Sequence, residues 1–303
     1  MLLRHFIGAR DVTALPVNNF KRSNLVTRIV SAIVMMPVVI YGTYLGYPYF
    51  NLLVGLFAAL IAWEYGCMIS SGRLDFVGKV LIIGLVASVM LASTGDHIPA
   101  ILSLVVMAVI FLCIDLASKL FFKAKKNPTE IERVIHPLSS FWIVAGGMYM
   151  GGACVSLIWI RNEWDNGLLV VMWILFLVWA SDCGAYAMGR LIGGPKLAPK
   201  ISPNKTWAGL VGCVISACIM GALVAQIAQL ENFYELVVLS GLIGLVSQMG
   251  DLMESAIKRY CGVKDSGNLI PGHGGVLDRV DALLAAIIAV AFLSFIKEGP
   301  LLI

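Results

Sequence analysis

Charged side chains are scarce in this sequence: Asp, Glu, Lys and Arg make up only 13% of its 303 residues, whereas 59% are hydrophobic. A soluble domain carries about a quarter charged residues, so a soluble globular protein is excluded. The apolar residues form continuous runs near the ~20 residues that a helix needs to cross a bilayer. They lack the alternation of a membrane-spanning β-barrel. The sequence therefore predicts an all-α, polytopic membrane protein.

Cysteine pairs and a common nucleotide-binding loop are also missing. The seven cysteines include no CxxC pair, which argues against a zinc site. They fall within the apolar runs or on the inner side, which argues against disulfides. The segment GRLIGGPK at 189–196 lacks the Gly-Lys-Ser/Thr ending of a Walker A loop. The net charge of +4 suits an anionic membrane surface, and we expect no nucleic-acid partner.

We expect about nine transmembrane helices. The apolar runs lie at approximately 29–46, 50–69, 79–94, 100–118, 138–159, 167–188, 207–228, 234–250 and 282–297. With a cytoplasmic N-terminus, all of the 22 Lys and Arg except Arg161 and Lys297 fall on the inner side, as the positive-inside rule requires. An error of one span would destroy this asymmetry. We therefore expect a multi-pass protein of the inner (plasma) membrane whose N-terminus is cytoplasmic.

The long polar loops of the second half all fall on the inner side, so chemistry is expected there. We expect a cytoplasmic N-terminal arm at 1–28, helices one to five at 29–160, and a catalytic part at 161–303. The catalytic part would comprise helices six to nine with cytoplasmic loops at 189–206 and 251–281. In the fifth span, Gly147 and Gly151 form a GxxxG pattern, which predicts close helix packing within the chain. A homodimer contact is the alternative.

Residues 250–281 place nine charged side chains and a histidine in a chain that is otherwise mostly apolar. If the eighth span continues as a helix into the cytoplasm, Asp251, either Glu254 or Ser255, and Lys258 share one face. A carboxylate, a hydroxyl and an ammonium group would then point the same way. The alternative interpretation is a solvated loop whose acids pair with neighbouring Lys and Arg.

A second acidic pair, Asp278 and Asp281, lies three residues apart near the start of the ninth span. Two acidic pairs at the membrane boundary could converge on Mg²⁺, which prefers carboxylate oxygens together with substrate phosphates. Between the pairs lies PGHGG at 271–275, whose glycines let backbone N–H groups approach an anion. A simple turn is the alternative. His273 would donate to a phosphate or only fix the loop.

The stretch SAIKRYCGVKDSGNLIPGHGGVLDRVD at 255–281 resembles, in order and spacing, the signature of the phosphatidate cytidylyltransferases, also called CDP-diacylglycerol synthases. Segments that look similar to the same family occur at 62–66, 181–193, 196–209 and 250–255. The resemblance therefore covers most of spans two to nine and leaves out the N-terminal arm. The chain departs from many members at Ala282, where they have Ser.

The resemblance implies a nucleotidyltransferase that converts CTP and phosphatidate to CDP-diacylglycerol and diphosphate in phospholipid biosynthesis, with Mg²⁺ required and a second cation as an option. It implies Asp251 and Asp278 as the leading metal ligands, with Asp265 and Asp281 as alternative ligands or supporting groups. Lys and Arg would clamp phosphates, Arg in a bidentate manner. The expected catalytic residues are Asp251, Lys258, Arg259, Lys264, Asp265, His273, Asp278, Arg279 and Asp281.

A second anion-handling element is expected in KLAPKISPNKTW at 196–207, where lysines alternate with prolines that stiffen the loop. Topology alone would also explain these lysines. Asp182 lies at the inner end of the sixth span, one turn from Tyr186, and an acid within a span is a candidate functional group. The expected substrate-binding residues are Asp182, Tyr186, Lys196, Lys200, Ser202, Asn204, Lys205, Thr206, Ser255, Gly272, Gly274 and Gly275.

Two alternative functions and two further acids complete the expectations. A transporter would suit nine helices with intramembrane acids, but these acids cluster at one face and not at the bilayer midplane. A CTP-dependent lipid kinase would release CDP in place of diphosphate. Glu64 and Asp115 lie near the inner ends of their spans, where snorkelling or helix pairing is expected.

Overall fold

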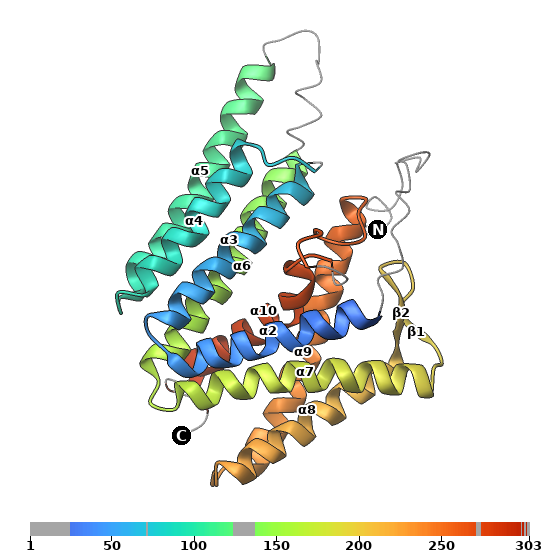
Figure 1. Cartoon of the computed structure of the whole chain (residues 1–303). Coiled ribbons are helices and arrows are strands. Elements are labelled where there is room, and N and C mark those ends of the chain that lie inside the picture. Colours follow the sequence, from blue (N-terminus) through green and yellow to red (C-terminus); the bar gives the residue numbers. More distant parts are fainter. Residues whose placement is uncertain are drawn as a thin grey trace.

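The computed structural model describes residues 25–70, 72–123, 137–270, 274–297, 299 and 301, which are almost entirely helical (Figure 1). The helices are α2 (Leu25–Leu45), α3 (Tyr49–Ile69), α4 (Phe76–Ala92), α5 (His97–Lys123), α6 (Pro137–Glu163), α7 (Gly167–Leu191), α8 (Trp207–Ile227), α9 (Phe233–Tyr260) and α10 (Leu277–Lys297). Strands β1 (Lys196–Ala198) and β2 (Ser202–Thr206) form an antiparallel hairpin between α7 and α8.

Each of the nine predicted spans corresponds to one of these helices, so the all-α, multi-pass fold class is confirmed. Within the described part, seven helices are long and apolar enough to cross a membrane. The other two are shorter apolar segments, in α2 and α4. With 17 residues, α4 extends about 25 Å, a little less than the ~30 Å hydrocarbon core of a bilayer.

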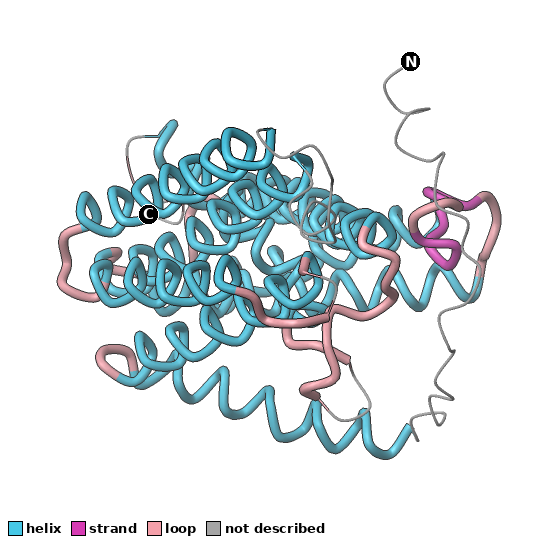
Figure 2. Tube along the Cα trace, turned by 90° about the horizontal axis from the view of Figure 1, so that it is seen from above, coloured by secondary structure: helices cyan, strands magenta, loops and turns pink. Residues whose placement is uncertain are grey.

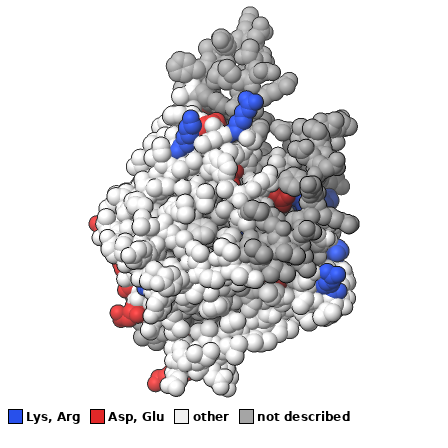
Figure 3. Space-filling model, in the orientation of Figure 1, with Lys and Arg blue, Asp and Glu red and all other residues white. Residues whose placement is uncertain are grey.

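The outer surface of the helices is suited to lipid. On α5, for example, Ile101, Leu102, Val105, Val106 and Val109 are all exposed. The face drawn in Figure 3 carries few charged side chains, most of them near its edges. Apolar surface of this extent is typical of a membrane contact.

Helix ends on the predicted inner side differ from the sequence-based boundaries. The eighth span was expected to stop near 250, but α9 continues to Tyr260. Likewise, α10 begins at Leu277, five residues before the expected start of the ninth span. In both cases the helix extends into polar sequence because helical hydrogen bonding does not depend on side-chain polarity. Five charged residues of the signature therefore lie on helices, namely Lys258, Arg259, Asp278, Arg279 and Asp281, whereas Lys264 and Asp265 lie in the loop between α9 and α10.

The hairpin was expected only as a loop. It lies beyond one end of the helical body, as Figures 1 and 2 show. Lys196 pairs with Thr206, and Ala198 pairs with Ser202. Thr206 then starts α8, because its hydroxyl accepts a hydrogen bond from Gly209 N at 3.1 Å. The short sheet thereby fixes Lys205 close to a helix end.

Helices α7, α8 and α9 pack closely because small residues line their contacts. A Cβ added at Gly212 on α8 would lie 2.5 Å from the backbone oxygen of Gly184 on α7. Between α7 and α9, Trp173 Nε1 donates to Ser240 Oγ at 2.9 Å, and both residues are fully buried. Buried polar groups in such a protein need partners within the chain, and these two satisfy each other.

The GxxxG pattern of the fifth span packs inside the chain, as predicted. A Cβ at Gly147 would lie 2.9 Å from Leu81 on α4, and one at Gly151 would lie 2.4 Å from Leu104 on α5. Both glycines thus allow α6 to approach α4 and α5. The homodimer stays a prediction and gains no interface from this motif.

Arg161, one of the two basic residues predicted to lie outside, caps the C-terminal end of α2. Its Nε donates to Thr43 O at 2.8 Å and its Nη2 donates to Tyr44 O at 3.3 Å. These carbonyls end α2, where the helix lacks internal donors and where a cation is favoured. The exception to the charge asymmetry is thereby explained by helix capping.

The glycine contact between α7 and α8 gives a test of the packing. Gly212→Ala should lower the free energy of unfolding by about 1–3 kcal/mol, because the new methyl group meets backbone that cannot rotate away. Gly152→Ala on α6 is the matched control, since no atom lies within 4 Å of the added Cβ. Unfolding of both variants in detergent measures the difference. Equal stability of the two variants would contradict this arrangement of α7 and α8.

Candidate active site

Polar and charged side chains of α7, α9, α10 and the hairpin meet in the C-terminal parts of α7 and α9 and at the start of α10. From the hairpin, Lys205 Nζ lies 2.6 Å from Asp251 Oδ2 on α9. From α9, Gln248 Nε2 donates to Asp182 Oδ1 on α7 at 3.4 Å. The two anion-handling elements that the sequence predicted separately therefore join at Asp251.

The predicted common face of α9 is present at its start. Ser255 Oγ donates to Asp251 Oδ1 at 3.3 Å, one turn away. Lys258, one turn further, points instead to Glu254 and to Asp278 on α10. The prediction of a shared face is thus confirmed for Asp251 and Ser255, and Lys258 joins α9 to α10.

Lys258 forms a buried ionic cluster with two carboxylates. Its Nζ lies 2.5 Å from Asp278 Oδ1 and is also in contact with Glu254 Oε2. The side chains of Lys258, Glu254 and Asp278 are only 10%, 8% and 4% exposed. A buried charge without a partner would be very unfavourable in these surroundings. The three residues therefore depend on one another.

The second oxygen of Asp278 holds the signature loop. Asp278 Oδ2 accepts from Ser266 N and from Gly275 N, each at 2.9 Å. Ile270 and Gly274 exchange two backbone hydrogen bonds, and Gly274 has a φ of +88°, which favours glycine. The loop therefore folds back on itself and ends at the start of α10.

The predicted anion cradle is only partly described. Gly272 and His273 lie outside the described residues, so their roles stay predictions. Gly275 N is directed at the carboxylate of Asp278. This N–H group therefore stabilises the loop and is not directed at an anionic substrate.

Carboxylates outnumber cations around Asp251. The carboxylate of Asp182 is repelled by Asp251 and attracted by Lys205 and Arg279. The carboxylate of Asp281 is repelled by Asp251 and Glu254. Asp182 is exposed and Asp281 is half-buried, so the cluster extends from the protein interior toward its surface.

The chemistry of these donors fits a hard divalent cation. In the described residues, no group of three or more His, Cys, Asp or Glu side chains is placed to hold a metal by itself. Mg²⁺ does not require such a group, because it is usually bound through one or two carboxylates together with substrate phosphates. Asp251 contacts Lys205 and Ser255, whereas both oxygens of Asp278 contact Lys258 and backbone donors. That both are metal ligands stays a prediction.

Other predicted residues surround the cluster without joining it. Arg259 donates to Ile201 O on the hairpin and to Val263 O at the end of α9, so it ties these two segments together. Tyr186 accepts a hydrogen bond from Arg190 Nη1 at 2.6 Å, and both side chains are exposed. Their roles in substrate binding stay predictions.

The remaining predicted residues are of two kinds. Thr206 is buried as the cap of α8, a structural task that the lysine-rich pattern did not indicate. The others are exposed or half-buried, and no contact with the cluster is described for Lys196, Lys200, Ser202, Asn204, Lys264 or Asp265.

The sequence did not indicate that Glu64 binds the signature loop and the start of α10. We expected snorkelling or helix pairing, but the Glu64 carboxylate on α3 is buried and accepts from Ser266 Oγ, Val276 N and Leu277 N. The snorkelling interpretation is therefore wrong. An acid within an apolar span was the available signal, but its partners lie more than 200 residues away and cannot be inferred from spacing.

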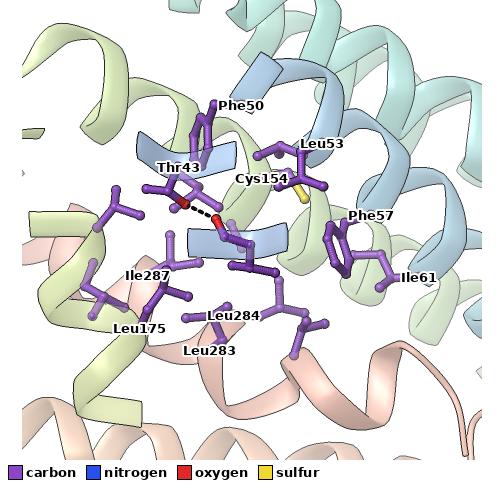
Figure 4. Close-up of a pocket in the computed structure, with 17 residues that line it drawn as sticks. Thr43, Phe50, Leu53, Phe57, Ile61, Cys154, Leu175, Leu283, Leu284 and Ile287 are labelled. Carbon is purple, nitrogen blue, oxygen red and sulfur yellow. Dashed lines mark hydrogen bonds between the residues drawn. The ribbon is translucent and has the colours of Figure 1, made fainter. Parts of the chain in front are cut away.

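A separate cavity of about 90 Å³ lies between α2, α3, α6, α7 and α10 (Figure 4). Its lining is apolar apart from Thr43 and Cys154, and Thr43 Oγ1 donates to Val39 O at 2.8 Å. A charged nucleotide would find no partner there. The polar cluster at Asp251 and Lys258 is therefore the candidate active site.

Comparison with known proteins agrees with the composition of this site. The sequence model described as "Cytidylyltransferase family" matches residues 26–296. The chain is 34% identical over 273 residues to a protein of Pseudomonas aeruginosa named phosphatidate cytidylyltransferase, covering 86% of this chain and 93% of that protein. It is 31% identical over 265 residues to a protein of the same name from Staphylococcus saprophyticus, covering 85% and 93%.

Other relatives match more strongly over a shorter length. A protein of Brucella suis, also named phosphatidate cytidylyltransferase, is 48% identical over 145 residues. That alignment covers 48% of this chain, so the chain spans about half the length, 54%, of that relative.

The buried ionic cluster predicts a large difference between neighbouring substitutions. Lys258→Met should lower the free energy of unfolding by about 3–5 kcal/mol, because it leaves Glu254 and Asp278 buried without a cation. Arg259→Met is the control on the same helix, since Arg259 is exposed and its hydrogen bonds in the described part of the chain go to the carbonyl oxygens of Ile201 and Val263. Its cost should stay within about 1 kcal/mol. Unfolding in detergent measures both, and similar losses would refute the central place of Lys258.

Proposed function

Because the chain belongs to the cytidylyltransferase family, we propose that it is a phosphatidate cytidylyltransferase. The reaction would join CTP and phosphatidate to give CDP-diacylglycerol and diphosphate. One observation carries the proposal beyond family membership. The hairpin lysine Lys205 meets Asp251, and the signature lysine Lys258 meets Asp278, at neighbouring helix ends. Such a site can bind two anionic substrates together.

The chemistry is an in-line displacement at phosphorus. An oxygen of the phosphatidate phosphate attacks the α-phosphorus of CTP, a new P–O bond forms, and the bond to the β-phosphate bridging oxygen breaks. Diphosphate leaves with that electron pair. Both reactants are anions, so the site must hold them together and offset negative charge in the transition state.

The chain's own cations would meet this demand. Lys205 Nζ lies 2.6 Å from Asp251 Oδ2, so it would contact a phosphate that binds beside Asp251. Lys258 is almost fully buried and would act by holding Asp278. Arg279 is exposed on α10 and would contact phosphate oxygens through its planar guanidinium group.

Mg²⁺ would be held by Asp251, whose carboxylate interacts electrostatically with those of Asp281 and Asp182. When bound, the ion supplies charge neutralisation and Lewis acidity toward phosphate oxygens. Asp278 remains the second predicted ligand. Its participation requires that Oδ1 exchange its contact with Lys258.

The proposed place of the site is the cytoplasmic face of the inner membrane. The basic residues of the hairpin and of the α9–α10 segment support this orientation through the positive-inside rule. CTP is available in the cytoplasm, and phosphatidate presents its phosphate at the membrane surface. The site at the helix ends suits both sources.

Turnover should depend on Asp251. Asp251→Asn should reduce CDP-diacylglycerol formation by at least about 100-fold, because it removes charge stabilisation where the phosphates react. The measurement is diphosphate release by purified protein supplied with CTP, phosphatidate and Mg²⁺.

Glu163→Gln is the control, because Glu163 lies on the proposed opposite side of the membrane. In the described part of the chain its ion-pair partner is His97. The substitution should leave turnover unchanged. Normal turnover by Asp251→Asn would sink the assigned role of Asp251.

The orientation can be tested with single cysteines in a variant that lacks the seven native ones. Cysteine at Lys200, on the hairpin, should react with a membrane-impermeant maleimide only after intact cells are permeabilised. Cysteine at Glu231, between α8 and α9, should react in intact cells. The reverse labelling pattern would overturn the proposed orientation.

A further inference from the structure

We propose that Glu64 is a positioning residue for the active site: its carboxylate, carried by α3, fixes the signature loop and the start of α10, and through them Asp278. Its effect on turnover rests on the function proposed above, whereas its effect on the loop does not. The residue lies in the first half of the chain, which the sequence analysis kept apart from the catalytic part.

The contacts of Glu64 are specific and buried. Glu64 Oε1 accepts from Val276 N at 2.9 Å, and Oε2 accepts from Leu277 N at 2.8 Å and from Ser266 Oγ at 3.1 Å. The residue is only 1% exposed, so it does not meet solvent or a water-soluble substrate. Its three donors are all neutral groups of the loop and of the first turn of α10.

Two of these donors belong to a helix N-terminus. The first N–H groups of a helix have no partner within the helix, and a negative charge there interacts favourably with the helix dipole. α10 begins at Leu277, so Glu64 caps it from a distant helix. This explains how a carboxylate is accommodated in the interior of an apolar protein.

Two glycines of the signature are shaped to fit this carboxylate. A Cβ added at Gly267 would lie 2.6 Å from Glu64 Oε1, and one at Gly275 would lie 2.5 Å from Oε2. Any larger side chain would therefore push Glu64 out of its place. The absence of a side chain at both positions therefore allows the close approach of α3.

Glu64 and Asp278 hold the same segment from opposite sides. Ser266 donates its hydroxyl to Glu64 and its backbone N–H to Asp278. Gly275 N donates to Asp278, and the next two backbone N–H groups donate to Glu64. If Glu64 lost its contacts, the loop would shift, and with it Asp278 and its bond to Lys258. A small displacement of this kind is sufficient to slow a reaction.

The substitution Glu64→Gln separates charge and hydrogen bonding from size. The amide keeps one acceptor oxygen. Its NH₂ group would face a backbone N–H, and because both groups are donors they cannot form a hydrogen bond. One N–H of α10 would then lose its partner. Asp75→Asn is the matched control, because Asp75 caps α4 by accepting from Gly78 N at 2.8 Å and has no part in the loop.

Hydrogen exchange tests the positioning without reference to activity. In Glu64→Gln, the amides of Val276 and Leu277 should exchange at least about tenfold faster, since local opening becomes easier when a buried donor loses its partner. In Asp75→Asn, only the start of α4 should change. Unchanged exchange at residues 276–277 in Glu64→Gln would overturn the proposal.

Kinetics then separates positioning from a merely structural role. We expect kcat to fall about 100-fold in Glu64→Gln, with a much smaller change in the KM for CTP, because Lys205 is untouched. Asp75→Asn should keep both constants. Faster exchange with an unchanged kcat would also overturn the proposal, because Glu64 would then be structural only.

Two further outcomes are informative. If Glu64→Gln does not fold, Ser266→Ala removes a single donor and should show the same two changes at smaller size; no change in either would overturn the proposal. If the unaltered chain makes no CDP-diacylglycerol while Glu64→Gln still accelerates exchange at 276–277, the proposed function fails and the positioning role stands.

Discussion

The carboxylate of Asp278 is the contact on which the active region depends. Its two oxygens accept from Lys258 on α9 and from the backbone of Ser266 and Gly275. In an apolar protein each of these groups needs its partner, because neither water nor lipid can replace it. The pairing therefore joins α9, the signature loop and α10 into one unit. Glu64 ties that unit to α3, so helices from both halves of the chain contribute to a single site.

Much of the fold could be predicted from the sequence, because the bilayer imposes its own length and polarity. Each apolar run became a helix, and the GxxxG motif around Gly147 packs internally as expected. The helix ends were less predictable. A polar sequence such as that from Asp251 to Tyr260 can form either a loop or a helix, and here it continues α9 and brings Lys258 to Asp278 on α10.

The site was predictable in composition but not in its pairing. The pattern of charged residues led to Asp251, Lys205, Lys258 and Asp278, and the structure brings them together in two ion pairs. No spacing rule could have matched Lys205 with Asp251 or Glu64 with Leu277, because such contacts are set by tertiary packing. Glu254 was treated only as part of a helix face, yet it shares Lys258 with Asp278. Burial, which determines how strongly charges depend on each other, is visible only in the folded chain.

The central claim is that the cluster transfers a cytidylyl group, and the fate of isotope from CTP tests it most directly. Purified protein with phosphatidate and Mg²⁺ should place label from α-³²P-CTP in the lipid extract. Label from γ-³²P-CTP should appear only in diphosphate, because the bond between the α- and β-phosphates is the one that breaks. Transfer of γ-label to lipid, or retention of both labels in CTP, would contradict the account.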